Sequence, residues 1–323
     1  MLLRKVLPVI ISASRRTDIP ALYSEWFMNR VRAGWCAVPN PMNMKQVSHV
    51  SLAPRDVDAI VFWSKNPAPM IPYLGELQAM GFRYYFQFTL NDYPKELEPN
   101  IPSLDSRIET FLKLSRQIDP LRVVWRYDPI IISNVTPFEF HREKFSRIAE
   151  ELRGATHRVM VSIVDFYQKT DRRLSQLESD GFSFDREAEF SKEMVGLLKD
   201  FASVTRKQGM DIYTCAEARD YSEVGIPPGR CIDESLLHRI WALDLRYKKD
   251  PAQREACLCM VSKDIGINDT CTHGCPYCYS TRNYALAERR HKEHDPTSPA
   301  IWGHYERPAE SKIPVSEQIK LPI

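Results

Sequence analysis

The sequence lacks several features that would place it in a large class at once. Glycine is scarce, with 12 residues among 323, which excludes a collagen-like or glycine-rich disordered chain. No apolar run approaches the roughly 18 residues of a membrane-spanning helix, so we expect no membrane partner. Basic and acidic residues nearly balance at 44 and 42, so charge does not favour generic polyanion binding. The phosphate-binding loops GxGxxG and GxxxxGK[ST] are both absent.

What is present is an ordinary globular composition with an unusual placement of cysteine. Hydrophobic residues make up 43% of the chain, enough to bury a sizeable core. The apolar start resembles a signal peptide, but Pro8 interrupts it, and we interpret it as a buried strand. Seven of the eight cysteines come after residue 214. Clustered thiols in a large chain without need of disulfides favour metal binding and a cytoplasmic location.

Apolar strand-like runs alternate with segments of helical periodicity along the first 214 residues. Strands separated by helical stretches of roughly 10–20 residues are typical of parallel βαβ units. The sequence therefore predicts the α/β class, as a single whole or partial (β/α) TIM-like barrel, with an open doubly wound sheet as the alternative. Helices are predicted over 21–31, after Asp105 and over 190–204. The predicted strands span residues 7–12, 56–63, 82–89, 121–125, 159–164 and 211–214.

Two segments fall outside this alternation. Residues 36–52 have the pattern of an inserted hairpin. The last thirty residues are polar and rich in proline, which is typical of a surface tail. We therefore expect one barrel domain over residues 1–292, with a tail over 293–323.

Polar side chains follow the end of each predicted strand. The carboxyl ends of parallel strands meet at one mouth of a barrel, and active sites gather there. Basic groups follow three of the six strands and suit a carboxylate or a phosphate. Separate helix caps and solvated loops are the alternative interpretation. The candidate cofactor- and substrate-binding residues at this mouth are Arg15, Arg16, Lys65, Asn66, Arg126, Asp128 and Glu217.

The most specific motif is the nonapeptide CTHGCPYCY, which begins at Cys271. Its CX3CX2C spacing places the thiolates of Cys271, Cys275 and Cys278 on one short loop. Three thiolates suit three irons of a [4Fe–4S] cluster, which four cysteines usually hold, so one iron stays open for an external ligand. A zinc knuckle, or a disulfide with a spare thiol, is the alternative.

This loop resembles the cluster loop of the radical S-adenosylmethionine (SAM) superfamily, and Tyr277 stands at the aromatic position of that motif. The chain as a whole resembles the DUF1848 family in SASRRTDIP, FWSKNP, WRYDP, TCAE, GRCID and the cysteine loop. The resemblance implies a [4Fe–4S] cluster with SAM at the open iron, cleaved reductively to a 5′-deoxyadenosyl radical. It also implies an external electron donor such as flavodoxin or ferredoxin, and Tyr277 among the cofactor-binding residues.

The position of the motif departs from that superfamily, where it usually follows the first barrel strand. Here it lies near the C-terminus. We therefore predict a circularly permuted barrel, which closes as well as an unpermuted one when the termini lie close together. Residues 262–268 would form the strand that leads into the loop, beside the strand at 7–12, and residues 281–291 the helix that follows.

Four further cysteines form a second candidate ligand set. Four thiols suffice for an auxiliary [4Fe–4S] cluster or a structural zinc, and unmetallated buried thiols are the alternative. Cys36 stands alone and is expected to be a small buried residue. The second set consists of Cys215, Cys231, Cys257 and Cys259.

Together these features predict a radical SAM enzyme whose substrate is a small molecule, a peptide or a nucleic acid. The CTHGCPYCY loop is also similar to that of spore photoproduct lyase, so repair or modification of nucleic acid is an alternative. The nearly balanced charge argues against it, because duplex binders usually carry a basic stripe. A non-catalytic iron–sulfur or zinc module is the rival from another class.

Overall fold

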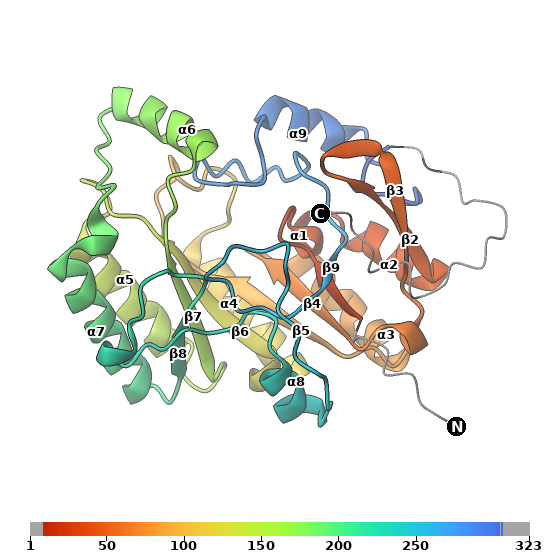
Figure 1. The fold of residues 1–323 in the computed structure, drawn as a ribbon, viewed down its shortest axis with the longest axis horizontal. Coiled ribbons are helices and arrows are strands. Elements are labelled where there is room, and N and C mark those ends of the chain that lie inside the picture. Colours follow the sequence, from red (N-terminus) through yellow and green to blue (C-terminus); the bar gives the residue numbers. More distant parts are fainter. Residues whose placement is uncertain (1–8, 304, 306–323) are drawn as a thin grey trace.

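The computed structural model describes residues 9–303 and 305, and a seven-stranded parallel sheet forms its centre (Figure 1). Across the sheet the strands are β8 (Asp211–Thr214), β7 (Arg158–Ile163), β6 (Val123–Ile130), β5 (Tyr84–Thr89), β4 (Ala59–Ser64), β1 (Ile10–Ala13) and β9 (Lys263–Asp264). The strands from β1 to β8 thus lie in chain order, and the last strand of the sheet pairs with the first.

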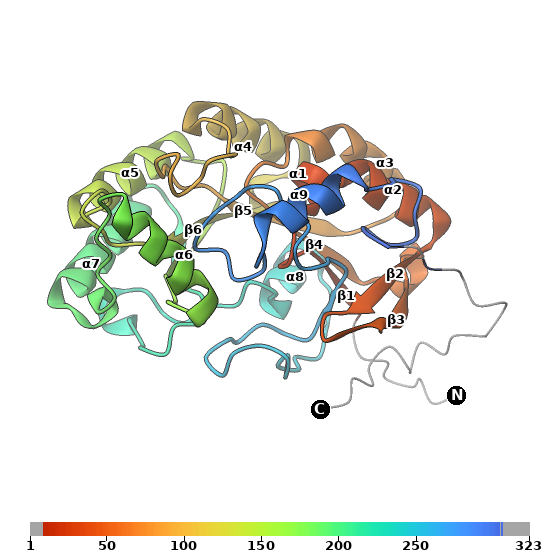
Figure 2. The ribbon, with the colours of Figure 1, turned by 90° about the horizontal axis from the view of Figure 1, so that it is seen from above.

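Helices follow the strands of the sheet, and most of them cover one of its faces. They are α1 (Ile19–Leu22), α2 (Ser24–Ala33), α3 (Leu74–Ala79), α4 (Leu104–Ile118), α5 (Phe138–Glu151), α6 (Gln168–Ser179), α7 (Lys192–Lys207), α8 (Glu234–Trp241) and α9 (Tyr284–Lys292). Figure 2 shows α3, α4, α5 and α7 following one another round the outer side of the molecule. Crossovers of one hand place successive helices on the same face of a sheet whose strands follow chain order.

Both faces of the sheet are buried, which explains why its strands are nearly continuous apolar runs. Successive side chains of a strand point to opposite faces. Phe62 and Phe86 therefore pack outward into the large core shared with the helices. Val61 and Tyr85 point inward, into a second core formed with α8 and residues 231–260.

The structure confirms the α/β class with a parallel sheet, but no closed barrel is found among the described residues. The sheet ends at β8 on one side and at β9 on the other, and these two strands are not paired. Closure would need further strands between them. Instead, the chain after β8 forms α8 and an irregular segment that covers the inner face of the sheet.

The two segments predicted outside the alternation have different positions. The predicted hairpin is present as β2 (Trp35–Asn40) paired antiparallel with β3 (Asn43–Ser51). Residues 296–301 of the predicted tail pack against α2 and β2, where Ala300 and Ile301 are buried. Residues 1–8, 304 and 306–323 lie outside the described residues, and with them the start of the strand predicted at 7–12. None of the described helices is long and apolar enough to cross a membrane.

Candidate functional site

A cavity of about 440 Å³ opens where the parallel strands end, within the size range of small-molecule sites. The ends of β1, β4, β5, β6, β7 and β8 all contribute to its wall, as expected for one shared mouth. Both predicted cysteine sets also reach it. The predicted site residues that line the cavity are Arg15, Arg16, Lys65, Arg126, Asp128, Tyr277, Cys215, Cys231, Cys257, Cys259, Cys271, Cys275 and Cys278.

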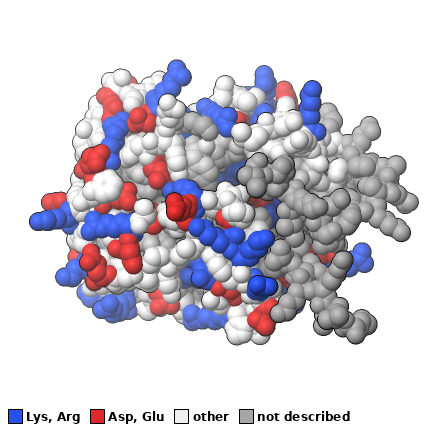
Figure 3. Space-filling model, in the orientation of Figure 1, with Lys and Arg blue, Asp and Glu red and all other residues white. Residues whose placement is uncertain are grey.

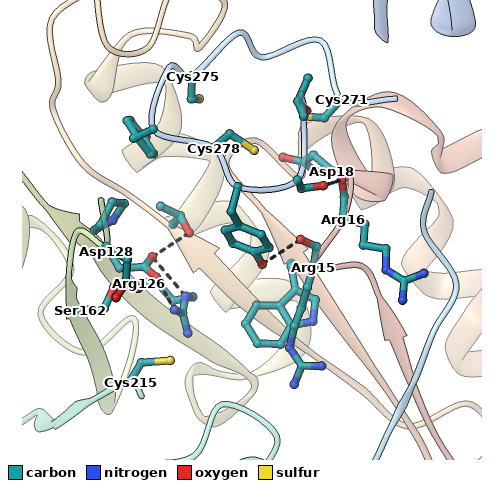
Figure 4. Close-up of a pocket in the computed structure, with 18 of the residues that line it drawn as sticks. Arg15, Arg16, Asp18, Arg126, Asp128, Ser162, Cys215, Cys271, Cys275 and Cys278 are labelled. Carbon is teal, nitrogen blue, oxygen red and sulfur yellow. Dashed lines mark hydrogen bonds and ion pairs between the residues drawn. The ribbon is translucent and has the colours of Figure 1, made fainter. Parts of the chain in front are cut away.

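The three cysteines of the CX3CX2C motif lie on one loop between β9 and α9, above the strand ends (Figure 4). Cys275 is buried, whereas Cys271 and Cys278 are half-buried. Burial raises the pKa of the Cys275 thiol to about 12, although the Lys65 ammonium opposes this rise. Burial also raises the pKa of Cys271, and the Cys278 thiol adds to that rise. Without a metal the thiols of Cys271 and Cys275 keep their protons, and a bound metal would displace them.

Side chains from two distant segments and from the start of α9 hold the backbone of this loop. Arg173 of α6 donates through Nε to the Pro276 carbonyl at 2.8 Å, and its two terminal nitrogens bond the carbonyls of Cys278 and Thr281. The Tyr284 hydroxyl donates to the Cys275 carbonyl. Asn100 donates to the Thr272 carbonyl at 2.8 Å. The loop is therefore ordered by its surroundings even though it contains little regular structure.

Gly274 is a position in the loop where only glycine fits. Its φ of +79° lies in the left-handed region, which disfavours residues with a Cβ. A Cβ there would also lie 2.8 Å from Cγ of Pro99. The close approach of the segment at Pro99 thus fixes the conformation of the backbone between Cys271 and Cys275.

His273 points inward from the loop and joins it to β1 and β4. Its Nε2 lies 2.8 Å from Oδ2 of Asp18, and both side chains are buried. The same carboxylate accepts the backbone N–H of Lys65 at 2.7 Å and caps α1 through the Ala21 N–H. One carboxylate therefore connects the cysteine loop to the ends of two strands.

Lys65 lies in a buried charge network behind Cys275. Its Nζ is 2.7 Å from Oε1 of Glu98 and 5.6 Å from the centre of the Tyr277 ring. The Tyr277 hydroxyl donates to the same Glu98 oxygen, and Arg107 lies 3.9 Å from the other oxygen. Glu98 acts against a negative charge on the Cys275 sulfur, whereas the Lys65 ammonium supplies a positive charge beside it. Such a charge favours the thiolate that a metal needs.

The second cysteine set also comes together in the fold. Cys215 follows β8, Cys231 precedes α8, and Cys257 and Cys259 lie in the irregular segment over the inner face of the sheet. The sulfurs of Cys215 and Cys231 are 3.0 Å apart. Hydrogen bonds from the thiols of Cys231 and Cys257 lower the pKa of Cys259, so all four thiols form a continuous chain of contacts.

Two guanidinium groups face this second set. Arg126 donates to the Cys231 sulfur at 2.7 Å and pairs with Asp128 through two nitrogens. Burial opposes the positive charge of Arg15, but the nearby Cys259 and Asp264 keep its pKa raised. Both guanidinium groups lie over the Trp63 ring, at 4.9 Å for Arg15 and 5.2 Å for Arg126. Two cations are suitable counter-charges for a cluster of thiolates.

Some predicted residues lie elsewhere. Asn66 and Glu217 do not line the cavity. The Asn66 side chain accepts the Ala68 N–H, and Glu217 accepts the Ile163 N–H at 3.0 Å. Burial raises the pKa of Glu217 to about 8. Arg16 contributes to the wall, but its side chain points away from Cys278 and Arg126 in Figure 4.

The cavity presents the thiol donors that an iron–sulfur cluster requires. In the described part of the chain, no three His, Cys, Asp or Glu side chains are arranged to hold one metal ion as they stand. A cubane cluster requires a different arrangement of ligands from a single ion, because each thiolate binds a separate iron at a corner of the cube. Three thiols on one ordered loop, open to a cavity, match a cluster with one free corner.

Sequence reasoning missed several residues of this site. Glu98 and Arg173 contact the loop and its lysine, and Trp63 lies between the two guanidinium groups. Glu98 and Arg173 lie in polar segments that resemble solvated surface. Trp63 ends a buried strand and resembles ordinary core. Of these three residues, only Trp63 could have been found from the sequence, because it directly precedes the polar residues that were singled out at the end of β4.

The site lies within a region that matches a known family. A family described as a domain of unknown function, DUF1848, matches residues 10–280. These residues include all seven strands of the sheet and all eight cysteines. A comparison with curated proteins gave no match. Since the family match covers most of its length, the chain belongs to the DUF1848 family.

Proposed function

We propose that the protein is a radical SAM enzyme whose [4Fe–4S] cluster is held by Cys271, Cys275 and Cys278. The observation that carries the proposal is one loop that presents three thiols to a cavity at the carboxyl ends of parallel strands. When bound, a reduced cluster on these three thiols would supply the electron for the reductive cleavage of SAM. Three cysteine ligands leave the fourth iron of such a cluster without a protein ligand, so that SAM can bind there.

The residues of the chain would prepare the site in three ways. Arg173 and Tyr284 fix the loop, so that the three thiols need little reorganisation to bind metal. The positive charge at Lys65 favours a thiolate at Cys275. Arg15, Arg126 and the Trp63 ring would form the floor on which SAM and substrate bind, and a closed cavity would keep water away from a reactive radical.

We infer an auxiliary [4Fe–4S] cluster at Cys215, Cys231, Cys257 and Cys259. The four thiols follow one another in a chain that begins with the 3.0 Å contact of Cys215 and Cys231, and they face the same cavity as the first set. Arg126 donates a hydrogen bond to the Cys231 sulfur, and Arg15 lies close to Cys259. Such counter-charges and hydrogen bonds to sulfur stabilise an anionic cluster, which favours iron–sulfur over unmetallated thiols.

We interpret the fold as a partial barrel that is circularly permuted. Read as β9-β1-β4-β5-β6-β7-β8, the strands follow one another as in a singly wound barrel, with the cysteine loop after the first strand. In a doubly wound sheet the strand order reverses at a switch point, and the strand order of this sheet has no such reversal. All eight cysteines are free thiols, which supports a cytoplasmic location.

The test is anaerobic reconstitution of the full chain with iron and sulfide, followed by a SAM cleavage assay with dithionite. We expect about eight irons per chain with both clusters, brown protein and release of 5′-deoxyadenosine. Cys275→Ala should abolish cleavage, because it removes a cluster ligand. Cys36→Ala is the matched control, since Cys36 is an isolated buried thiol and should leave cleavage unchanged.

Other outcomes would end the proposal. Full cleavage activity in Cys275→Ala would remove that thiol from the cluster. Colourless protein with stoichiometric zinc, or a cluster that never cleaves SAM, would favour a structural metal module. About four irons per chain would restrict the proposal to the loop at 271–278.

A further inference from the structure

A hollow of about 570 Å³ outside the main cavity is lined by side chains that can donate hydrogen bonds. It lies between α6 and the residues that follow the cysteine loop, and no carboxylate contributes to its wall. In Figure 3, several basic side chains project along the upper edge of the molecule, where Figure 1 places α6 and α9. The hollow is lined by Arg172, Arg173, Ser175, Gln176 and Arg282.

The Asp269 carboxylate lies beside this hollow and accepts the backbone N–H of Arg282, but among the described residues it forms no ion pair with the guanidinium groups. In the described part of the chain, no ion pair joins Arg172, Arg173 or Arg282 to a carboxylate. The acidic residues of α6, Asp171 and Glu178, are already paired with Arg186. By contrast, Arg254 at the wall of the main cavity pairs with Asp165. Three guanidinium groups in one hollow therefore create a local positive potential.

The hollow is also the outer wall of the cysteine loop. Arg173 lines it and at the same time donates to the carbonyls of Pro276 and Cys278. A protein that docked there would be separated from the loop by little more than the Arg173 side chain. The main cavity shares no lining residue with the hollow, so a partner in the hollow would leave the cavity to the substrate.

We propose that this hollow, formed by Arg172, Arg173 and Arg282, is the docking surface for an acidic electron-carrier protein. The inference rests on the proposed function, which consumes one electron from outside the chain for each SAM cleaved. Electron-transfer encounters are small and steered by charge, so a few guanidinium groups suffice. A nucleic acid would need an extended basic stripe, whereas acidic and basic side chains interleave over most of the face in Figure 3.

The test compares two double variants of the reconstituted full chain that change the net charge equally. Arg172→Glu with Arg282→Glu reverses the hollow. Arg83→Glu with Arg116→Glu is the control, because Arg83 precedes β5 at the opposite end of the sheet and Arg116 is exposed on α4. The probe is oxidised flavodoxin, an acidic flavoprotein, titrated by calorimetry at low and high salt. Cleavage of SAM is then driven either by reduced flavodoxin or by dithionite.

We expect the hollow variant to bind flavodoxin about tenfold more weakly at low salt, and the difference to shrink at high salt. Cleavage driven by flavodoxin should fall by a similar factor, whereas cleavage driven by dithionite, which needs no docking, should stay unchanged. Equal losses in both variants, or none in either, would overturn the docking site. Arginine-dependent binding of single-stranded DNA without flavodoxin binding would overturn it in favour of a nucleic acid. Absence of dithionite-driven cleavage in the wild type would instead refute the proposed function.

Discussion

At the scale of single residues, His141 on α5 is a buried imidazole that the fold keeps neutral. Its Nε2 donates to the Ile131 carbonyl at 3.0 Å, and its Nδ1 accepts from the Tyr127 hydroxyl at 2.9 Å. Burial lowers its pKa to about 4. Below about pH 6.5 the unfolded chain gains a proton that the folded chain does not bind. The free energy of unfolding should therefore fall by up to about 3 kcal/mol from pH 6.5 to 4.

The measurement is urea unfolding of the metal-free protein at several pH values between 4.5 and 7.5. His141→Gln should be less stable than the wild type at pH 7.5, but its stability should fall less on acidification. His238→Gln is the control, because His238 is exposed on α8, and it should keep the wild-type slope. Identical slopes in all three proteins would assign the pH dependence to other groups.

Most of the residues predicted for the site do line the cavity, but residue types alone did not predict the partners of each residue. The expectation for Lys65 rested on its place after a strand, and it does line the cavity. Its pairing with Glu98 joins positions 33 residues apart, and no local pattern encodes such a contact. Arg126 is similar, because its bond to Cys231 spans 105 residues. Spacing predicts which groups reach a common mouth, whereas tertiary packing decides which of them meet.

At the scale of elements, the conformation of the cysteine loop depends on a glycine that packs closely against a neighbouring segment. Gly274→Ala would place a Cβ 2.8 Å from Pro99 in addition to straining the left-handed backbone. The strain alone costs roughly 1–2 kcal/mol. We expect the variant to lose more stability than this and to retain less iron after reconstitution, because the loop must move away from Pro99. Iron content and thermal unfolding are the measurements.

Gly154→Ala is the matched control for that variant. Gly154 has a similar φ of +74°, but no atom lies within 4 Å of an added Cβ. It should therefore lose only the cost of the strained backbone and keep the iron content of the wild type. Equal losses of iron in the two variants would show that the contact with Pro99 does not shape the loop.

The strands of the sheet were easier to predict than its helices. Strands such as β4 and β5 are buried on both faces, so they appear as apolar runs that stand out from their surroundings. The helix α5 was missed, because half of its surface is solvated and polar residues interrupt its apolar stripe. The strand β9 spans only two residues, and the motif that follows it was needed to locate it.

At the scale of the whole molecule, the sequence predicted parallel strands meeting at one mouth but not where the sheet would end. Barrel closure depends on whether further strands pair between β8 and β9, and alternation of strands and helices does not determine that. The sequence also did not predict what covers the inner face of the sheet. It is covered by α8 and the cysteine segment, whose irregular backbone has no periodic signal. The second thiol set therefore belongs to the core as well as to the site.

The strand order leads to a prediction about connectivity. Because β9 pairs with β1, a chain that starts at Tyr247 and joins the natural ends through a flexible linker would place β9 before β1. Tyr247 lies in the exposed segment after α8. We expect this permutant to fold, to unfold cooperatively and to bind as much iron as the wild type. A permutant opened at Met42, the exposed tip of the β2–β3 hairpin, is the control. If the control folds while the permutant opened at Tyr247 does not, the contacts of β9 depend on continuity with α8, and the permuted-barrel interpretation fails.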